Sequence, residues 1–483
     1  MPIIRVLFCV VLFLPAMGTV GRAQPCVGFQ LAQSGQATVG SNFGSLSCDD
    51  YNQDGFADVL LTVPLTQPLQ LIYGDGAGSF TVPVPFDPGY MPLNVDTGDF
   101  NGDGFLDLLI GTTGSNVVLA TGSSSGVFTV ALDLNVGSQR SYVSVGDLTA
   151  DGNLDFVVTR QALTGPSHVR LYPGDGAGGF ANPLDIVSGE VPDQVEIADF
   201  DGNGTLDLAV GSVSLSATAQ PSLNIHYGAL SGGVGPATLV TNAYSGGFSS
   251  ADVNGDGVRD FAVIQFIPIT VCGQALTIHL STATGGYSAG TPITAVCGPY
   301  WPRFADFDAD GNLDLAYTDG GDFVASANWL LIHLGDGAGN FAAPCNPATG
   351  SWSLGRFATP DLNNDQRPDF VAPNFGPNGL VAFLNTNPIL SDFVRGDCND
   401  DGAVNLADAV RGLNHLFPIG TPTPLSCESA CDANDDDVLN LADPVAVLNA
   451  LFSSPPTVLP GPSVCGADPT PALIDCATFV NCP

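Results

Sequence analysis

Short apolar runs of strand length dominate the sequence between residues 24 and 392. None of them shows sustained helical periodicity; examples are DVLLTV at 58–63, DLLIGT at 107–112, DFVVTR at 155–160 and DFAVIQ at 260–265. A second apolar segment follows about ten residues later and often ends in a glycine turn, as in LIYGDGAGSF, LYPGDGAGGF and LIHLGDGAGNF. Glycine and aspartate supply the left-handed conformations that hairpin turns need. The pattern predicts small antiparallel sheets.

One acidic phrase precedes each of these runs. It reads DYNQDGFAD at 50–58, DFNGDGFLD at 99–107, DLTADGNLD at 147–155, DFDGNGTLD at 199–207, DVNGDGVRD at 252–260, DFDADGNLD at 306–314 and DLNNDQRPD at 361–369. The starts are separated by 49, 48, 52, 53, 54 and 55 residues. The sequence therefore contains seven units of about fifty residues each, which indicates a repeat architecture.

A single small sheet cannot bury both of its faces, but seven sheets arranged radially bury each against its neighbours. We therefore predict an all-β fold, a seven-bladed β-propeller over residues 24–392. An open β-solenoid is the alternative, although its repeats are usually shorter. The strand-like segment VGFQLAQ at 27–33 lies before the first motif and is placed to complete the last blade and close the ring.

The acidic motif has the ligand chemistry of a calcium loop. Side chains at its positions 1, 3, 5 and 9 can converge, glycine at position 6 permits a sharp bend, and position 7 offers its backbone carbonyl. Ca²⁺ prefers such oxygen cages, with six to eight ligands at about 2.3–2.6 Å, whereas Zn²⁺ prefers nitrogen and sulfur. The predicted ligands in the seven loops are Asp50, Asn52, Asp54, Phe56, Asp58, Asp99, Asn101, Asp103, Phe105, Asp107, Asp147, Thr149, Asp151, Asn153, Asp155, Asp199, Asp201, Asn203, Thr205, Asp207, Asp252, Asn254, Asp256, Val258, Asp260, Asp306, Asp308, Asp310, Asn312, Asp314, Asp361, Asn363, Asp365, Arg367 and Asp369.

These units resemble FG-GAP/VCBS repeats, the calcium-loop blades of integrin α-subunit propellers and of many secreted bacterial proteins. The resemblance covers about residues 26–392 and implies a calcium ion in each loop. Two copies depart from the motif. Thr149 replaces an acid or amide in the third loop, and the seventh has Gln366 in place of glycine and contains Pro368. We expect these two sites to be the weakest.

A different pattern begins after residue 392. DCNDDGAVNLAD at 397–408 and DANDDDVLNLAD at 432–443 are twelve-residue loops, and each runs into a segment of helical periodicity. The pair resembles the duplicated loop–helix unit of dockerin type I domains over about residues 393–453. The resemblance implies two further calcium sites with the ligands Asp397, Asn399, Asp401, Ala403, Asn405, Asp408, Asp432, Asn434, Asp436, Val438, Asn440 and Asp443.

The dockerin-like tail also departs from the pattern of that family. Dockerins commonly carry small hydroxyl residues at loop positions 10 and 11 for cohesin recognition, where this chain has Leu406-Ala407 and Leu441-Ala442. Asp437 replaces glycine in the second loop. The cysteine-rich end of the chain resembles extensions on dockerin-like tails outside cellulosomes. We expect residues 393–483 to be a calcium-folded attachment module with a cohesin-like or cell-envelope partner.

Charge and composition agree with calcium and argue against nucleic acid. The formal charge is -37, and the acids comprise 45 aspartates and 3 glutamates, while 11 arginines and no lysine oppose them. Such a preference for the shorter acid suits tight loops. Nucleic-acid binding needs clustered basic residues, so we exclude it.

The N-terminus predicts export. Residues 1–23 have one early arginine, an apolar core and a small-x-small cleavage site at Gly21-Arg22-Ala23, as in a signal peptide. No later stretch is apolar enough for a membrane span, so we expect a secreted, extracellular protein, either free or held at the cell surface. The twelve cysteines suit that compartment. Cys26–Cys48 and Cys272–Cys297 are candidate pairs, Cys345 is the candidate odd cysteine, and the tail cysteines form disulfides or, alternatively, a zinc site.

Several other motifs have ordinary explanations. Arg395-Gly396-Asp397 spells an adhesion tripeptide, but its aspartate begins a calcium loop, so we expect it to be inaccessible. His226, His279 and His333 fall at matching places in three units, and we expect them on blade surfaces, because packed sheets lie about 10 Å apart, too far for one zinc ion. Asn203-Gly204-Thr205 matches a glycosylation sequon inside a metal loop.

The sequence predicts a binding or adhesion protein. We expect calcium-dependent binding of a glycan or protein ligand at or outside the cell surface. The alternative is a secreted carbohydrate-active enzyme, a polysaccharide lyase or hydrolase, or an accessory protein of polysaccharide degradation. No catalytic motif and no convergent set of a base and cations can be identified in the sequence. A structural surface-layer component is a third class.

Overall fold

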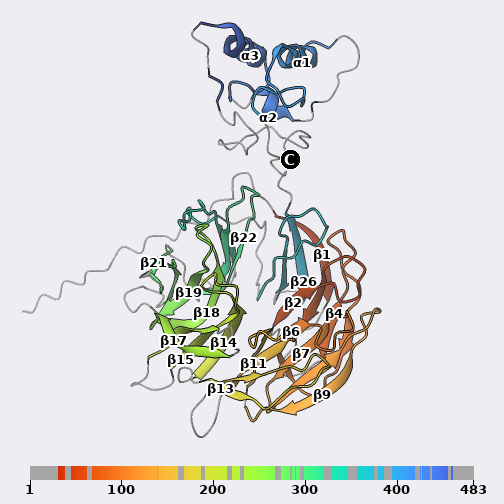
Figure 1. Cartoon of the computed structure of the whole chain (residues 1–483). Helices are drawn as coiled ribbons and strands as arrows, with labels where there is room; N and C mark the ends of the chain where they lie inside the picture. The colour runs from red at the N-terminus through yellow and green to blue at the C-terminus, as the bar shows by residue number, and fades with distance from the viewer. Residues whose placement is uncertain are drawn as a thin grey trace, which may run out of the picture.

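The computed structural model contains seven antiparallel sheets arranged around a central axis, followed by a small helical region (Figure 1). It describes residues 31–38, 45–62, 68–138, 140–160, 168–186, 191–214, 220–228, 233–266, 274–282, 286–288, 290–293, 298–319, 329–345, 356–374, 379–385, 394–418, 425, 427–435, 438–454 and 458–460. The predicted signal peptide lies outside this part of the chain.

Five sheets have four strands each, and their strands follow chain order. They are β2 (Leu46–Asp49), β3 (Asp58–Leu61), β4 (Leu69–Ile72) and β5 (Val84–Phe86); β6 (Pro92–Gly98), β7 (Asp107–Thr112), β8 (Asn116–Thr121) and β9 (Thr129–Asn135); β10 (Val143–Gly146), β11 (Asp155–Arg160), β12 (His168–Tyr172) and β13 (Leu184–Ile186); β14 (Val191–Ala198), β15 (Asp207–Val213), β16 (Ser222–Gly228) and β17 (Val234–Thr241); and β18 (Tyr244–Ala251), β19 (Asp260–Phe266), β20 (Gln274–His279) and β21 (Thr291–Pro292).

Two sheets have three strands. One follows chain order, with β22 (Pro299–Ala305), β23 (Asp314–Asp319) and β24 (Trp329–His333). The other joins the two ends of the ring, in the order β1 (Leu31–Thr38), β26 (Gly379–Asn385) and β25 (Phe370–Asn374). The chain is thus a mainly-β propeller of six blades and a partial seventh sheet.

Pairing of β1 with β26 links the start of the propeller to its end. The two strands are antiparallel, from Leu31 opposite Asn385 to Thr38 opposite Gly379, with one irregularity between Gln33 and Gly35. The prediction that an N-terminal strand closes the ring is confirmed. The strand lies later than the predicted 27–33, and residues 27–30 are outside the described part.

The hydrophobic core lies between the sheets. Each of the seven pairs of neighbouring sheets shares a cluster of buried side chains; one cluster joins Leu60 and Leu71 to Leu108 and Ile110, for example. Because a blade is covered on both faces, the second strand of the complete blades is buried along almost its whole length, as in β7. This explains why these strands read as continuous apolar runs and do not alternate.

The helical region follows the ring. Its helices are α1 (Leu406–Leu416), α2 (Glu428–Cys431) and α3 (Ala442–Phe452), and they enclose a small core of Ala409, Ala433 and Val447. Asn405 caps α1 by accepting from the Ala407 N–H, as part of a capping box with Asp408. Among the described residues, no helix is long and apolar enough to cross a membrane.

The cysteines differ in part from their predicted roles. Cys398 and Cys431 form a disulfide, and Cys427 is also disulfide-bonded, so a zinc site on these three cysteines is excluded. Cys48 is a free thiol, so the predicted Cys26–Cys48 pair is wrong. Cys345 is disulfide-bonded and is not the odd cysteine. The predicted Cys272–Cys297 pair lies outside the described residues.

Candidate calcium sites

In each acidic loop the chain folds back over the first aspartate. In the second copy the Asp99 carboxylate accepts from the N–H of Asp103 (3.1 Å) and Gly104 (2.8 Å), and Asp103 Oδ1 accepts from the Phe105 N–H (2.9 Å). The same bonds from positions 5 and 6 to position 1 occur in all seven propeller loops and in the first loop of the tail. The repeated sequence thus gives one repeated turn.

The turn requires two left-handed residues, at positions 4 and 6. Position 6 is glycine in six propeller loops, with φ between 84° and 89°, and Gln366 takes φ 66° in the seventh. Position 4 is glycine in three loops and elsewhere Gln53, Ala150, Ala309 or Asn364, again with positive φ. Left-handed backbone costs residues other than glycine about 1–2 kcal/mol, which accounts for the glycines.

The aspartate at position 9 ties the loop to its blade. Asp107 is fully buried; its Oδ2 accepts from the Phe100 N–H (3.0 Å) and its Oδ1 from the Gly122 N–H (2.9 Å), just after the third strand. All seven position-9 aspartates are fully buried and accept an N–H bond of 2.7–2.9 Å from a residue at the end of the blade's next strand. Each acidic loop therefore fixes where the second strand begins and where its partner strand ends.

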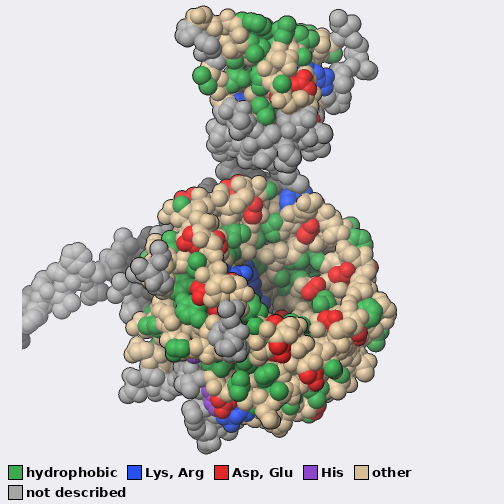
Figure 2. All heavy atoms as spheres, in the orientation of Figure 1, with side chains coloured by type: hydrophobic (Ala, Val, Ile, Leu, Met, Phe, Trp, Pro, Cys, Tyr) green, Lys and Arg blue, Asp and Glu red, His purple; other side chains and the backbone are tan. Residues whose placement is uncertain are grey.

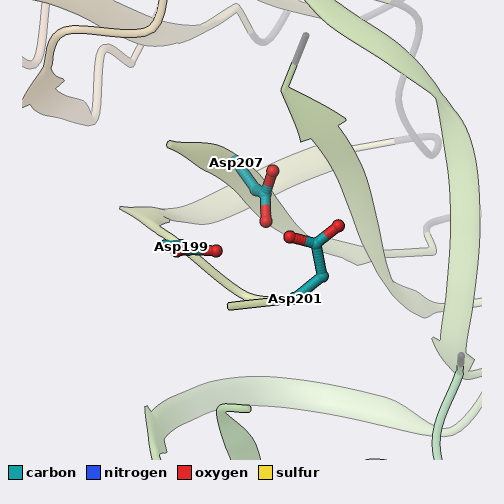
Figure 3. A group of neighbouring side chains, drawn as sticks. All are labelled: Asp199, Asp201 and Asp207. Carbon is teal, nitrogen blue, oxygen red and sulfur yellow. The ribbon is translucent and has the colours of Figure 1, made fainter. Parts of the chain in front are cut away.

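Carboxylates converge in two loops as the ligand pattern predicts. Asp199, Asp201 and Asp207 each offer an oxygen, and these atoms lie within 4.8 Å of one another (Figure 3). Asp306, Asp308 and Asp314 form a second such triad. In each triad the position-9 aspartate is buried and the others are more accessible. Oxygen donors alone, without nitrogen or sulfur, fit Ca²⁺, and the carbonyls of Thr205 and Asn312 at position 7 would complete the donor sets.

Comparison with known families agrees with this geometry. The model of the FG-GAP-like repeat matches residues 50–110, 101–158, 147–210 and 306–372. The chain contains FG-GAP-like repeats within a β-propeller. The matches leave out the fifth motif at 252–260, yet Asp252 there accepts the same loop bonds, from Asp256 (3.1 Å) and Gly257 (2.8 Å). No curated protein matches the sequence.

Solved structures resemble the FG-GAP-like propeller only distantly. BBS1N in complex with ARL6DN is 10% identical, covering 76% of this chain and 99% of that chain, with a TM-score of 0.49. The Penicillium chrysogenum α-L-arabinanase complexed with arabinobiose is 12% identical (73% and 98% covered, TM-score 0.41). The exotype rhamnogalacturonan lyase YesX is 12% identical (76% and 91% covered, TM-score 0.31). These neighbours include carbohydrate-active enzymes, and at such TM-scores they support no conclusion on function.

Burial and neighbouring carboxylates disfavour the charged form of the aspartates in the loops of the FG-GAP-like repeats. Burial raises the pKa of Asp58 to about 7, with Asp54 and Asp50 adding to the shift, and raises the pKa of Asp314 to about 8, with Asp308 and Asp306 adding to it. The pKa values of the other five position-9 aspartates are also raised, first by burial. A divalent cation relieves this cost, because it favours the charged carboxylates.

Calcium stabilisation should therefore depend on pH. A carboxyl with a raised pKa in the folded state holds a proton between its unfolded value, about 3.9, and its folded value, so the calcium-free protein loses stability as pH rises through that window. Calcium must displace these protons, so its affinity falls about tenfold per pH unit below the pKa for each proton displaced. We expect the calcium-induced rise in Tm to be larger at pH 8 than at pH 5.5 in paired thermal melts. An equal rise at both pH values would contradict a role for these carboxyls.

The third and seventh loops differ from the others in structure as well as in sequence. In the third, the N–H of Thr149 itself donates to Asp155 Oδ2 (2.8 Å). In the seventh, the Arg367 guanidinium is paired with Asp365, which is the position-5 ligand. A side-chain cation thus competes with a metal for that carboxylate. The sequence pattern treated Arg367 only as the source of a backbone carbonyl and missed this pairing.

Replacing Gln366 with glycine should stabilise the protein. The backbone at Gln366 is left-handed, and at the equivalent Gly55 an added Cβ would have no atom within 4 Å, so conformation and not space sets the cost. We expect Gln366→Gly to raise the free energy of unfolding by about 1 kcal/mol, measured by urea denaturation with calcium present. Gly55→Gln in the first loop should lower it by a similar amount. If neither change has an effect, the left-handed strain at position 6 is absent.

The first tail loop folds like a propeller loop. Asp397 accepts from Asp401 (3.1 Å) and Gly402 (2.8 Å), and Asp408 at position 12 accepts from the N–H groups of Asn399 (3.1 Å) and Asn405 (2.7 Å). In the second loop Asp443 accepts in the same way from Asn440 (2.8 Å). Burial raises the pKa values of Asp408 and Asp443 to about 6. The predicted ligand Asp436 lies outside the described residues.

The Arg395-Gly396-Asp397 tripeptide is buried, as predicted. Arg395 is 1% exposed; it donates to the Asp432 carbonyl (2.8 Å) and pairs with Asp435 (2.9 Å). Asp397 is fully buried. The arginine therefore links the two tail loops and is not available to a receptor.

The three matching histidines are interior residues. His226, His279 and His333 are at most 3% exposed, and the Nδ1 of each lies 2.7–3.0 Å from the carbonyl oxygen of the residue nine positions later. Burial lowers the pKa of all three. The expected blade-surface position is therefore wrong; these imidazoles join the third strand of a blade to the segment beyond it.

A set of charged residues that the sequence pattern did not bring together lines the middle of the ring. Figure 2 shows a central hollow with arginine side chains on its wall. Arg303 of β22 acts electrostatically on Arg356, which lies before the seventh motif, and Glu196 of β14 acts on Arg303. The sequence does carry a signal for them, since all three lie three or five residues before the first aspartate of a motif.

Proposed function

We propose that this protein is an exported, seven-bladed, calcium-stabilised propeller that acts as a binding or adhesion module at or outside the cell surface, toward a glycan or protein ligand. The observation that carries the proposal is the repetition of one loop geometry in seven copies, each tied through a buried aspartate to its blade. Calcium in these loops would hold the blades rigid, so that the remaining loops and the central hollow offer a fixed contact surface.

The helical tail supports attachment. In this proposal residues 1–23 are the export signal, 24–392 the propeller and 393–483 a dockerin-like module. Its two loops, which begin at Asp397 and Asp432, lead into helices that share one small core, and the Cys398–Cys431 disulfide joins the two halves. Calcium would fold this module, and its partner would be a cohesin-like or cell-envelope protein.

A second function is favoured by the residues of the central hollow. Burial raises the pKa of Asp193 to about 6 and also raises the pKa of Glu196, and arginines act on both carboxyls. A carboxyl with a raised pKa beside a cation is a candidate general base or acid. The second candidate is therefore a carbohydrate-active enzyme that works on an acidic polysaccharide.

One screen separates the two functions. The immobilised protein is exposed to arrays of glycans and extracellular proteins, in calcium and in EDTA, and bound glycans are also incubated to detect new sugar ends. Retention of a ligand in calcium alone, without new ends, supports the binding function. Calcium-dependent release of sugar ends would contradict the binding function and support the enzyme. Self-assembly in calcium without binding of any ligand would indicate a surface-layer component.

A further inference from the structure

Two positions beside the first strand of each blade form two rings of side chains around the propeller axis, and some of these side chains reach the channel. The first strands of neighbouring blades pack beside each other around the axis, and along each of them alternate residues point in opposite directions. Residues four before each motif, such as Val95, Phe248 and Phe357, are buried in the cores between blades. Arg356 and Tyr142 interact electrostatically, as do Arg303 and Glu196, although their blades are not neighbours, so these side chains face the channel. We call the residues five and three before each motif the two rings. They are Ser45, Asn94, Tyr142, Gln194, Gly247, Trp301 and Arg356, and Ser47, Asp96, Ser144, Glu196, Ser249, Arg303 and Ala358.

Four polar members of these rings, Asn94, Asp96, Gln194 and Glu196, bond to the next blade. Asn94 exchanges two hydrogen bonds with the Val143 backbone (2.9 and 3.0 Å), and Asp96 accepts from the Val145 N–H (2.9 Å). Gln194 bonds in the same way to Phe248 (2.9 and 3.2 Å). These side chains therefore link neighbouring blades through hydrogen bonds within the protein.

The two arginines of the rings are different. Within the part of the chain that the structure describes, neither Arg303 nor Arg356 has a carboxylate oxygen within 4.0 Å, and the hydrogen bond found for this pair of guanidinium groups runs from Arg303 Nη1 to the Pro302 carbonyl (3.1 Å). Arg356 lies over the Trp301 ring, 3.7 Å from its centroid. Both arginines are half-buried. Among the described residues, no other hydrogen-bond acceptor is found for the N–H donors of these two arginines.

The backbone at Trp301 is held in an unfavourable conformation. Its φ is 56°, and it lies at an irregularity of β22 between Tyr300 and Arg303. All other described non-glycine residues with positive φ belong to the acidic loops of the propeller and tail. Such strain in a bulky residue costs about 1–3 kcal/mol and is typical of binding sites, and bulges often re-aim side chains beside such sites. Here the strained residue supplies the indole that lies under Arg356.

We propose that Arg303 and Arg356 bind the acid group of an acidic saccharide, a carboxylate or a sulfate, in the channel of the propeller. This inference rests on the binding function proposed above and names the class of its ligand. Guanidinium groups bind oxyanions through paired, charge-assisted hydrogen bonds, which are strongest away from bulk water. Asp193 and Glu196 act on these arginines from a distance, but neither forms an ion pair with them within 4.0 Å. In a chain with a net charge of -37, two such arginines at one half-buried place form a local site for a negative group.

The acids of the same rings point to a sugar and not to a multiply charged ion. Glu196 and Asp96 stand at the position equivalent to Arg303 in other blades. Glu196 accepts from the Ser250 hydroxyl (2.5 Å) and lies 3.9 Å from Arg259 Nη1, and its carboxylate has acceptor capacity left. Carboxylates would repel a second nearby anionic group but accept hydrogen bonds from hydroxyl groups. A saccharide with one acid group per sugar unit and several hydroxyl groups would match both the arginines and the carboxylates of the rings.

Calorimetric titration in calcium chloride buffer tests this assignment. The probes are trigalacturonic acid, a sulfated disaccharide, galactotriose as the neutral control, and inorganic sulfate. We expect at least one acidic saccharide to bind, galactotriose not to bind, and the affinity to fall at least tenfold in the Arg303→Gln/Arg356→Gln double variant. Arg160→Gln, which changes an arginine of β11, should bind as the unchanged protein does. Comparing the two acidic probes decides between carboxylate and sulfate.

Three results would overturn the proposal. They are no binding of either acidic saccharide at millimolar concentration, equal binding by the double variant, and binding of inorganic sulfate as tight as that of the saccharides. A calcium-dependent Tm for each variant shows that the fold is intact. If the Tm of the unchanged protein does not depend on calcium, the proposed calcium-stabilised propeller is wrong. Failure of the proposed function can therefore be distinguished from failure of the proposed saccharide site.

Discussion

Removal of calcium with EDTA is expected to lower the melting temperature by about 3 to 4 °C for every loop that was occupied. A ligand at 100 times its Kd stabilises the folded state by about 2.7 kcal/mol per site. A propeller of about 370 residues has an unfolding entropy of about 0.8 kcal/mol/K, which gives the shift per site. The two aspartate triads, at Asp199–Asp207 and Asp306–Asp314, alone predict about 7 °C.

The expected shift has a specific source in each loop. Without the ion, buried Asp207 and Asp314 keep raised pKa values, because burial and nearby carboxylates disfavour their charge. With the ion, the same carboxylates become ligands. Differential scanning calorimetry in calcium, in magnesium and in EDTA measures the effect. Magnesium should restore little, because it resists so many protein ligands.

Matched single variants locate the effect in the loops. Asp201→Ala removes an accessible member of the first triad and should take away about 3 to 4 °C of the calcium-dependent shift, which is one site's share. Asp87→Ala removes an exposed carboxylate outside the motifs and should leave the shift unchanged. If EDTA does not move the Tm, or both variants respond alike, the loops are not the calcium sites.

The repeated parts of this molecule could be predicted from its sequence. The spacing of the motifs predicted a sheet per unit, because Asp107 and its equivalents recur just where an apolar run begins. The hydrogen bonds that Asp99 accepts from Asp103 and Gly104, and the one that Asp107 accepts from Phe100, join residues at most seven positions apart. Such bonds depend on local chain geometry, which the spacing of the motif encodes. Local chemistry repeated seven times is a strong signal.

Contacts between units were much harder to predict. His279 was expected on a surface, but its place between a strand and the segment beyond it depends on how that segment returns. The Arg367–Asp365 pair depends on a side-chain rotamer that the motif does not encode. Trp301 and Arg356 lie 55 residues apart in the sequence, and the packing of two neighbouring units brings them together. Such contacts depend on tertiary geometry, which cannot be derived directly from the pattern of a single sequence.

Deletion of residues 24–38 is expected to open the ring and destabilise the whole propeller. The deletion removes β1, whose pairing with β26 runs from Leu31–Asn385 to Thr38–Gly379. It would expose the backbone donors and acceptors of β26 as a free sheet edge, which favours aggregation. We expect a loss of several kcal/mol in unfolding free energy, a broader thermal transition and calcium-dependent association of the shortened chain.

A peptide of residues 24–40 added in trans should reverse these changes in part, because the vacant edge of β26 accepts a strand of that register. A scrambled peptide of the same composition is the control, and deletion of residues 393–483 tests whether any truncation has the same effect. The interface between the first blade and the last sheet, where Val59 and Leu61 pack against Val371 and Leu380, would remain in the shortened chain. An unchanged Tm after loss of β1 would therefore show that packing across this interface, and not strand pairing, closes the ring.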